Sequence, residues 1–206
     1  MGSDHKNNVE KELHGADGKK LSIVISGWPA VGKTTIAEKI SENFDLKLWN
    51  GGDILKMMAY EKGYSSALNN DWWDTDEAIK FMTERNKNPN FDKEVDKRLI
   101  DLVKKGNVVV TSYTLPWISD ASVKFWLHGS IDNRAKRMAT RDNLDIETAK
   151  KIVIRRDNDN KNIYRKLYNF EFGENLDVFD FALNTDILSL DALIGISNQI
   201  VKNISF

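Results

Sequence analysis

The sequence contains no cysteine, so the chain can form neither a disulfide framework nor a thiolate metal site. It also lacks an apolar run long enough to span a membrane. The first residues are charged and lack the apolar stretch of a secretory signal, and no lipidation pattern follows the first methionine. These absences predict a cytoplasmic protein without a membrane partner.

The most informative segment that is present covers residues 27–34. It reads Gly27-Trp28-Pro29-Ala30-Val31-Gly32-Lys33-Thr34, which matches the P-loop pattern G-x-x-x-x-G-K-[ST]. Residues 21–26 have the apolar character of a buried strand, and residues 35–40 have helical apolar spacing. A chance match is the alternative, but the correct flanks on both sides argue against it. The motif therefore predicts a bound nucleoside triphosphate at the positive end of a helix, with Lys33 at the β- and γ-phosphates and Thr34 on Mg²⁺.

The net charge of −1 hides an uneven distribution. Residues 134–166 carry 11 Lys/Arg against 5 Asp/Glu, a balance of +6, which leaves −7 for the rest of the chain. A solvated helix face is the ordinary explanation for such a run. In a chain with a phosphate-binding loop it favours a segment that faces a polyanion, whereas the acidic remainder argues against a nucleic-acid partner.

Strand-like and helix-like segments alternate along the 206 residues. Strands are expected at 21–26, 46–50, 107–112, 123–128 and 178–183. Helices are expected from an N-cap at Asp53, after a turn at Gly51-Gly52, and at about 74–86, 91–105, 131–141, 146–170 and 188–201. This order predicts an α/β fold, a three-layer sandwich in which helices cover both faces of a central parallel sheet. The P-loop then lies at the carboxyl edge of that sheet.

The segments that accompany the loop narrow the class of P-loop protein. A GTPase would need a guanine-reading N-K-x-D and a switch D-x-x-G, and neither occurs. A motor-type ATPase usually has an apolar strand that ends in an acid, whereas the strand at 107–112 ends in Thr111-Ser112. A small-molecule kinase remains, with a basic helical lid that closes over the phosphates. The arginines of this lid are Arg134, Arg137 and Arg141 on one helical face, followed by Arg155, Arg156 and Arg165.

The kinase interpretation gives a domain plan and a set of catalytic residues. We expect a flexible tail over residues 1–20 and a single P-loop kinase domain over residues 21–206. Within that domain, an acceptor-binding insert at about 53–105 and a lid at about 134–170 are expected. The predicted catalytic residues are Lys33, Asp53, Arg137 and Arg141.

Several residues of the predicted insert are candidates for the acceptor site, each with a structural alternative. Asp53 is predicted as a general base or an outer ligand of Mg²⁺, and a helix cap explains it equally well. Asp92 and Asp96 lie one helical turn apart, where a solvated helix start is the simpler explanation. The remaining candidates are tryptophans, which either wall the acceptor pocket or pack in the core; they are Trp72, Trp73 and Trp117. Trp28 is expected to cover the phosphates or to pack against the lid.

From the P-loop to Thr185 the chain resembles the archaeal-type cytidylate kinases, a branch of the nucleoside monophosphate kinases. The shared pieces are the P-loop, Gly52-Asp53-Ile54, residues 92–98 and 106–110, Arg134-Ala135-Lys136-Arg137-Met138, Arg156-Asp157, Tyr164-Arg165, Tyr168 and Asn184-Thr185. The resemblance implies that Asn184 and Thr185 contact the adenine. The implied ATP site is Gly27, Trp28, Pro29, Ala30, Val31, Gly32, Lys33, Thr34, Thr35, Arg134, Arg137, Asn184 and Thr185. The predicted acceptor site, taken from the residues and the resemblance together, is Asp53, Trp72, Trp73, Asp92, Asp96, Tyr113, Arg156 and Arg165.

The chain departs from this family at the acceptor site. After the third strand the family has an acid followed by Gly-Arg, whereas this chain has Thr111-Ser112-Tyr113. It also has Asn162-Ile163 where the family tends to have paired basic residues. A tyrosine cannot replace the charge of an arginine that faces a phosphate.

Three functions therefore stay open. The first is an ATP- and Mg²⁺-dependent kinase that transfers the γ-phosphoryl group to a nucleoside monophosphate, above all CMP. The second is a P-loop kinase for another small acceptor, such as a mevalonate phosphate. The third is a nucleotide-binding regulatory module without transfer chemistry. In each case a monomer or a dimer is expected.

Overall fold

The computed structural model describes residues 20–69, 72–86, 88 and 90–204. The tail predicted over residues 1–20 lies outside the described residues, apart from Lys20. No helix in the described part of the chain combines the length and the apolarity needed to cross a bilayer.

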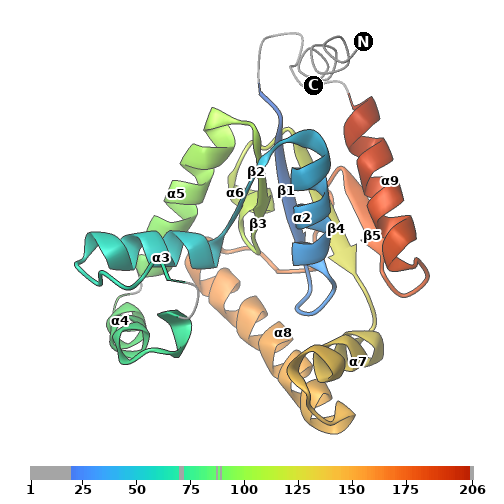
Figure 1. Cartoon of the computed structure of the whole chain (residues 1–206). Helices are drawn as coiled ribbons and strands as arrows, with labels where there is room; N and C mark the ends of the chain where they lie inside the picture. The colour runs from blue at the N-terminus through green and yellow to red at the C-terminus, as the bar shows by residue number, and fades with distance from the viewer. Residues whose placement is uncertain (1–19, 70–71, 87, 89, 205–206) are drawn as a thin grey trace.

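A five-stranded parallel sheet forms the centre of the molecule, in the order β2-β3-β1-β4-β5 (Figure 1). Its strands are β1 (Ser22–Gly27), β2 (Lys47–Asn50), β3 (Val108–Thr111), β4 (Val123–His128) and β5 (Phe181–Asn184). All six residues of the central strand β1 are buried, as expected for a parallel strand that is covered on both faces. The predicted parallel sheet is confirmed.

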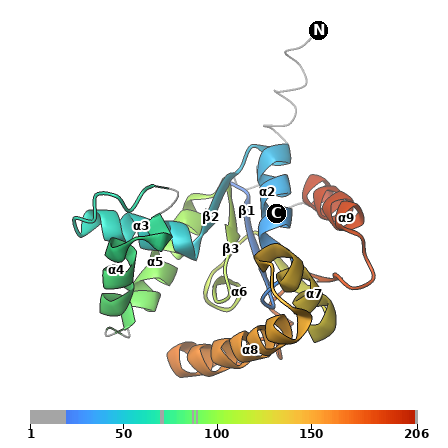
Figure 2. The ribbon, with the colours of Figure 1, turned by 60° about the horizontal axis from the view of Figure 1, so that its bottom comes forward.

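Helices cover both faces of this sheet and extend beyond its carboxyl edge (Figures 1 and 2). They are α2 (Lys33–Phe44), α3 (Gly51–Glu61), α4 (Asp76–Asn86), α5 (Phe91–Lys105), α6 (Leu115–Ile118), α7 (Ile131–Asp142), α8 (Ile146–Tyr168) and α9 (Leu190–Asn203), with a 3-10 turn η1 (Trp72–Asp74). Helices α7 and α8 lie together beneath the strand ends in Figure 1, and we call this pair the lid hairpin.

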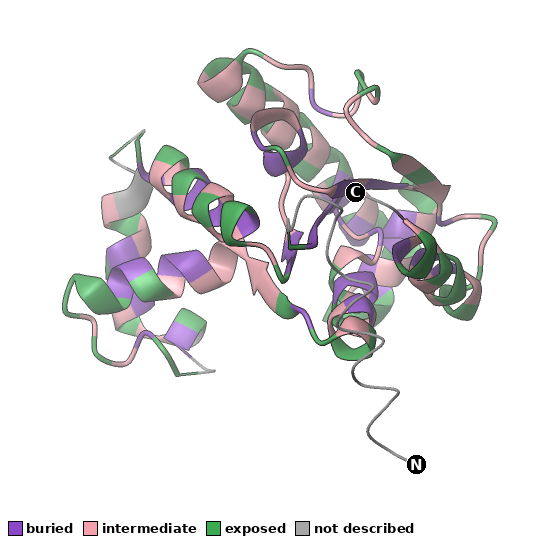
Figure 3. Ribbon diagram, turned by 90° about the horizontal axis from the view of Figure 1, so that it is seen from above, coloured by how far each residue is buried: buried purple, intermediate pink, exposed green. Residues whose placement is uncertain are grey.

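The alternation of side chains along the strands separates two apolar cores. In β3, Val109 packs with residues of α2 and α9, whereas its neighbours Val108 and Val110 pack with residues of α3 and α5. Figure 3 shows buried residues in the central strands and on the inward sides of the helices, with exposed residues outside. The three-layer sandwich is therefore built by a period of two in the strands and an apolar stripe on each helix.

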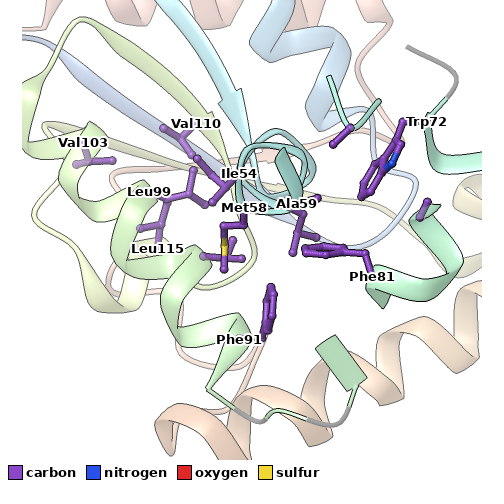
Figure 4. Close-up of a cluster of buried hydrophobic side chains, with 14 of the residues drawn as sticks. Ile54, Met58, Ala59, Trp72, Phe81, Phe91, Leu99, Val103, Val110 and Leu115 are labelled. Carbon is purple, nitrogen blue, oxygen red and sulfur yellow. The ribbon is translucent and has the colours of Figure 1, made fainter. Parts of the chain in front are cut away.

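One of these cores extends away from the sheet into the predicted acceptor insert (Figure 4). Trp72 and Phe81 are fully buried there, their ring centroids 5.6 Å apart, and Phe91 contacts Phe81 edge-on at 5.4 Å. Trp73 packs on Trp72 at 4.8 Å but keeps 38% of its surface exposed. The two adjacent tryptophans therefore have different surroundings.

The structure differs from the sequence expectations at several element ends. Helix α3 already begins at Gly51, where a turn was expected, and its N-cap is Asn50. The predicted N-cap at Asp53 is therefore wrong. Asp53 occupies the third position instead, where its carboxylate accepts from the Asn50 N–H at 2.9 Å and its own N–H donates to the Asn50 side chain at 3.1 Å. This capping box pairs N–H groups that the first turn of a helix otherwise leaves without an intrahelical partner.

Two further differences concern the second half of the chain. Strand β5 starts three residues later than expected, because Phe179 closes a turn onto the carbonyl of Leu176 at 3.0 Å. The short helix α6 was not predicted, and a helix of four residues gives too little periodicity to be recognised.

The unequal burial of the adjacent tryptophans gives a stability prediction. Trp72→Ala should lower the free energy of unfolding by about 3–5 kcal/mol, because it empties a closed part of the core. Trp73→Ala should lower it by about 1 kcal/mol, because its ring is partly in solvent. Urea denaturation followed by far-UV circular dichroism measures both values. Equal losses for the two variants would contradict the core position of Trp72.

Candidate active site

The phosphate-binding loop joins β1 to α2 with a backbone that glycine permits. Gly27 has φ 145°, and a Cβ atom there would lie 2.1 Å from the carbonyl oxygen of Leu127. Gly32 has φ 95° and is the N-cap of α2, and Ala30 also has a positive φ of 62°. The loop therefore curls around the N-terminus of α2, where backbone N–H groups and the helix dipole favour an anion. This backbone fits the phosphates of ATP.

Lys33 folds back onto this loop. Its ammonium donates to the carbonyls of Gly27 at 2.9 Å and Trp28 at 2.8 Å, and it lies 4.6 Å from the centre of the Tyr113 ring. Enclosure of the ammonium, together with the charges of Arg156 and Arg134, lowers the pKa of Lys33 to about 7. A polyphosphate that binds beside this enclosed ammonium would stabilise its protonated form.

A cleft of about 560 Å³ opens beside Lys33, between the loop, the acceptor insert and the lid hairpin. The first turn of α3 and one face of α5 form one wall, residues 111–114 form the floor, and α8 forms the opposite wall. Its lining residues are Lys33, Thr34, Asn50, Gly51, Gly52, Leu55, Asp92, Val95, Asp96, Leu99, Thr111, Ser112, Tyr113, Thr114, Asn160, Ile163 and Tyr164. Five residues predicted from sequence meet here, from segments far apart in the chain: Lys33, Thr34, Asp92, Asp96 and Tyr113.

Asp96 is the most enclosed acid of the cleft. It is 8% exposed, and each carboxylate oxygen accepts a hydroxyl at 2.6 Å, one from Thr114 and one from Tyr168. Burial raises the pKa of Asp96, and these two hydrogen bonds oppose the shift. Asp96 is therefore a built part of the wall and not a solvated helix start.

Arg134 lies inside the protein, against the expectation that it faces the nucleotide. Its guanidinium is buried, pairs with both carboxylate oxygens of Asp157 at 2.8 and 2.7 Å, and donates to the carbonyls of Pro29 at 3.3 Å and Gly129 at 3.0 Å. It therefore ties the phosphate loop to both helices of the lid hairpin. The spacing that places Arg134 on one helical face with the other lid arginines does not indicate these buried contacts.

The other two arginines on that face lie in different places. Arg137 donates to the side chain of Thr185 at 2.9 Å and to its carbonyl, beside Asn184 at the end of β5. Arg141 is exposed and pairs with the neighbouring Asp142 at 2.7 Å, and the pKa of Arg141 is raised by this contact and by the nearby Tyr113. Arg137 thus contacts Thr185, one of the two residues expected at the adenine, whereas Arg141 is near Tyr113 but does not line the cleft.

The two arginines of the predicted acceptor site belong to α8. Arg156 is exposed, and its charge contributes to the lowered pKa of Lys33, so it lies near the phosphate end of the cleft. Arg165 is 59% exposed and pairs with Glu171, outside the residues that line the cleft.

The aromatic candidates are mainly packing residues. Trp28 contacts Phe172 at 5.1 Å and Trp126 at 5.8 Å, so it packs against the chain that leaves the lid hairpin. Trp117 stacks on Phe170 at 4.5 Å in the same cluster. Trp28 therefore packs the loop against this cluster and against Lys161 of α8, which lies 5.6 Å from the centre of its ring.

Five predicted acceptor residues are absent from the lining of the cleft, namely Arg156 and Arg165 as described above, and Asp53, Trp72 and Trp73. Trp72 is in the core, Trp73 lies beside Gly52, where an added Cβ atom would be 3.8 Å from its ring, and the carboxylate of Asp53 is engaged in the capping box of α3. Residues that sequence reasoning missed are Asn50, Thr114, Asn160 and Tyr164, which line the cleft, and Tyr168, which binds Asp96. Tyr164 and Tyr168 were part of the family resemblance without a role, whereas Thr114 carried no signal.

The side chains of the structure also limit how a Mg²⁺ ion could be bound. Within the described residues, no group of three or more Asp, Glu or His side chains is placed to hold a metal ion. Mg²⁺ keeps several waters and binds substrate phosphates with few protein ligands, so Thr34 at the start of α2 fits it as one ligand beside bound phosphates.

Comparison with known proteins agrees with this geometry. The cytidylate kinase-like family matches residues 22–187. Cytidylate kinase from Pyrococcus horikoshii is 31% identical over 186 residues, with 90% of each chain covered, and that from Pyrobaculum islandicum is 34% identical over 177 residues, with 85% and 89% covered. Shikimate kinase from Bacteroides thetaiotaomicron shares the fold, with a TM-score of 0.54 at 16% identity over 88% of this chain and 96% of that one. The predicted family resemblance and the P-loop kinase fold are confirmed.

The lowered pKa of Lys33 predicts a proton linkage on nucleotide binding. Above pH 7 the free side chain loses its proton, and polyphosphate raises its pKa again, so binding of ATP at pH 8.5 should take up about one proton. Below pH 6 the uptake should vanish, because Lys33 is already charged. Calorimetry in buffers of different ionisation enthalpy measures this. Lys33→Arg should abolish the uptake and Lys39→Arg, on the exposed side of α2, should keep it; uptake that survives Lys33→Arg would contradict the assignment.

The buried ion pair between Arg134 and Asp157 predicts that two Asp→Ala substitutions differ in their effect on stability. Asp157→Ala should lower the free energy of unfolding by about 3–5 kcal/mol, because it leaves the guanidinium without its partner inside the protein. Asp142→Ala removes a comparable pair at the surface and should leave the stability nearly unchanged. Thermal and urea denaturation of both variants measure the difference, and a small effect of Asp157→Ala would show that the contact is dispensable.

Proposed function

The chain belongs to the cytidylate kinase-like family, and from this premise we propose that it transfers the γ-phosphoryl group of ATP to a nucleoside monophosphate, above all CMP. Membership makes the chain a phosphotransferase, so the regulatory module without transfer chemistry is not retained. The names of the relatives favour CMP as the acceptor.

The observation that carries the proposal is the single cleft shared by Lys33, Thr34 and residues of the insert and the lid hairpin. Phosphoryl transfer has a loose transition state, so the protein mainly positions groups and neutralises charge. Lys33 and the loop amides are placed for the β- and γ-phosphates. In this scheme Arg141 and Arg156 would add positive charge on the lid side, and α8, which forms a wall of the cleft, would limit the access of water.

The acceptor itself supplies the nucleophile. A phosphate monoester is largely dianionic at neutral pH, since its second pKa is about 6. Its oxygen can therefore attack without a general base, and the capping role of Asp53 is compatible with transfer. In this scheme the lining amides, hydroxyls and carboxylates, among them Asn50, Asp92 and Ser112, bind the neutral part of the acceptor.

One observation favours the second candidate, a kinase for a non-nucleotide phosphate such as mevalonate phosphate. Among the described residues that line the cleft, Lys33 is the one basic side chain, and Tyr113 stands where the family has an arginine. The second candidate also uses a phosphate nucleophile, so the same chemistry serves both.

An ADP-release assay over a panel of acceptors tests the proposal. We expect turnover with CMP, a much lower kcat/KM with AMP, and a loss of more than about 100-fold in Lys33→Met, which also controls for a contaminating kinase. Turnover with mevalonate phosphate and none with CMP would transfer the assignment to the second candidate. No turnover with any acceptor, in a protein that binds ATP, would contradict both.

A further inference from the structure

Tyr168 lies at the end of the lid hairpin and has no part in the scheme above. We propose that Tyr168 is a positioning residue for phosphoryl transfer, whose hydroxyl ties the end of α8 to Asp96, so that one carboxylate holds both the acceptor and the lid hairpin. The inference rests on the proposed function in one respect, namely that the acceptor occupies the cleft.

The geometry at Asp96 supports a shared role. Asp96 belongs to α5 and lines the cleft, while the Tyr168 hydroxyl donates to one of its oxygens at 2.6 Å. Thr114, at the floor of the cleft, donates to the other oxygen at 2.6 Å. An ionised carboxylate offers about four acceptor positions, so two hydroxyls leave room for a donor from a bound acceptor.

Ring packing fixes the direction of the Tyr168 hydroxyl. Its ring is nearly parallel to Phe170, at 6.3 Å and 13°, and Phe170 stacks on Trp117 at 4.5 Å and 6°. Tyr164, one helical turn earlier, is also nearly parallel to Phe170 at 6.0 Å. The tyrosine is therefore held between the lid hairpin and the core, and its hydrogen bond to Asp96 costs little further ordering.

The position of Tyr168 along α8 connects this contact to the wall of the cleft. Tyr168 is the last residue of α8, and the chain reverses at Asn169, which has φ 55°. Asn160, Ile163 and Tyr164 line the cleft within the preceding turns. Since a helix rises about 1.5 Å per residue, Tyr164 lies only about 6 Å along the axis from the anchored end. A displacement of Tyr168 therefore moves the wall that faces the acceptor.

The arrangement predicts coupling between the two substrates. An acceptor that donates to Asp96 joins a chain of hydrogen bonds that ends on the lid hairpin, and the same hairpin is tied through Arg134 to the loop that receives ATP. Each ligand then strengthens the binding of the other by the same factor, as linkage requires.

The test compares Tyr168→Phe with Tyr64→Phe. Tyr64 makes a similar bond, from its hydroxyl to Glu84 at 2.8 Å, but it lies outside the residues that line the cleft. The affinity for a non-hydrolysable ATP analogue is measured with and without saturating CMP, together with kcat and the KM for ATP. In wild type and in Tyr64→Phe, CMP should tighten the analogue. In Tyr168→Phe we expect this tightening to disappear and kcat to fall about tenfold, while the KM for ATP at saturating CMP rises by the factor of tightening that is lost.

Coupling and kcat that survive in Tyr168→Phe would overturn the inference, as would an equal loss in Tyr64→Phe. Failure of CMP to bind the wild-type protein would count against the proposed function instead. In that case, amide hydrogen exchange of the unliganded protein tests whether Tyr168 anchors the end of α8. Faster exchange at the end of α8 in Tyr168→Phe, with α7 unchanged, supports it, and unchanged exchange at both helices overturns it.

Discussion

The buried guanidinium of Arg134 is the contact on which the arrangement of the site depends. It binds the carbonyl of Pro29 in the phosphate loop, the carbonyl of Gly129 after β4 and the carboxylate of Asp157 in α8. A small apolar core reinforces it, in which Met138 and Val153 of the lid hairpin are buried together with Ala30 of the loop packed against them. The loop that receives phosphate and the hairpin that covers it are therefore joined.

This joint also sets the electrostatics of the loop. Arg134 and Arg156 lie close enough to Lys33 to lower its pKa, and Asp157 offsets only part of their effect. A cluster of cations around an enclosed lysine is unfavourable until an anion neutralises it. In the proposed reaction the phosphates of ATP would supply that charge, so the same residues that hold the loop and the lid hairpin together would also prepare the loop for its ligand.

The sequence predicted what local signals determine and missed what distant partners determine. The strand before the loop, the P-loop glycines and the apolar stripe of α5 are encoded within a few residues, and the structure contains each of them. The role of Arg134 depends on Pro29 and Asp157, 105 and 23 residues away, which no periodicity reveals. Trp28 likewise takes its packing role from Phe172 beyond α8.

Charge is segregated along the cleft, and this constrains how an acceptor lies in it. Lys33, with Arg156 near it, marks one end, whereas Asp92 and Asp96 lie on the α5 wall. A phosphate close to these acids would meet repulsion in a partly enclosed site, where charges are poorly screened. In the proposed reaction, the acceptor phosphate would therefore point toward Lys33, with the neutral part of the acceptor against α5. The placement of the acids would favour this orientation as much as the placement of the cations.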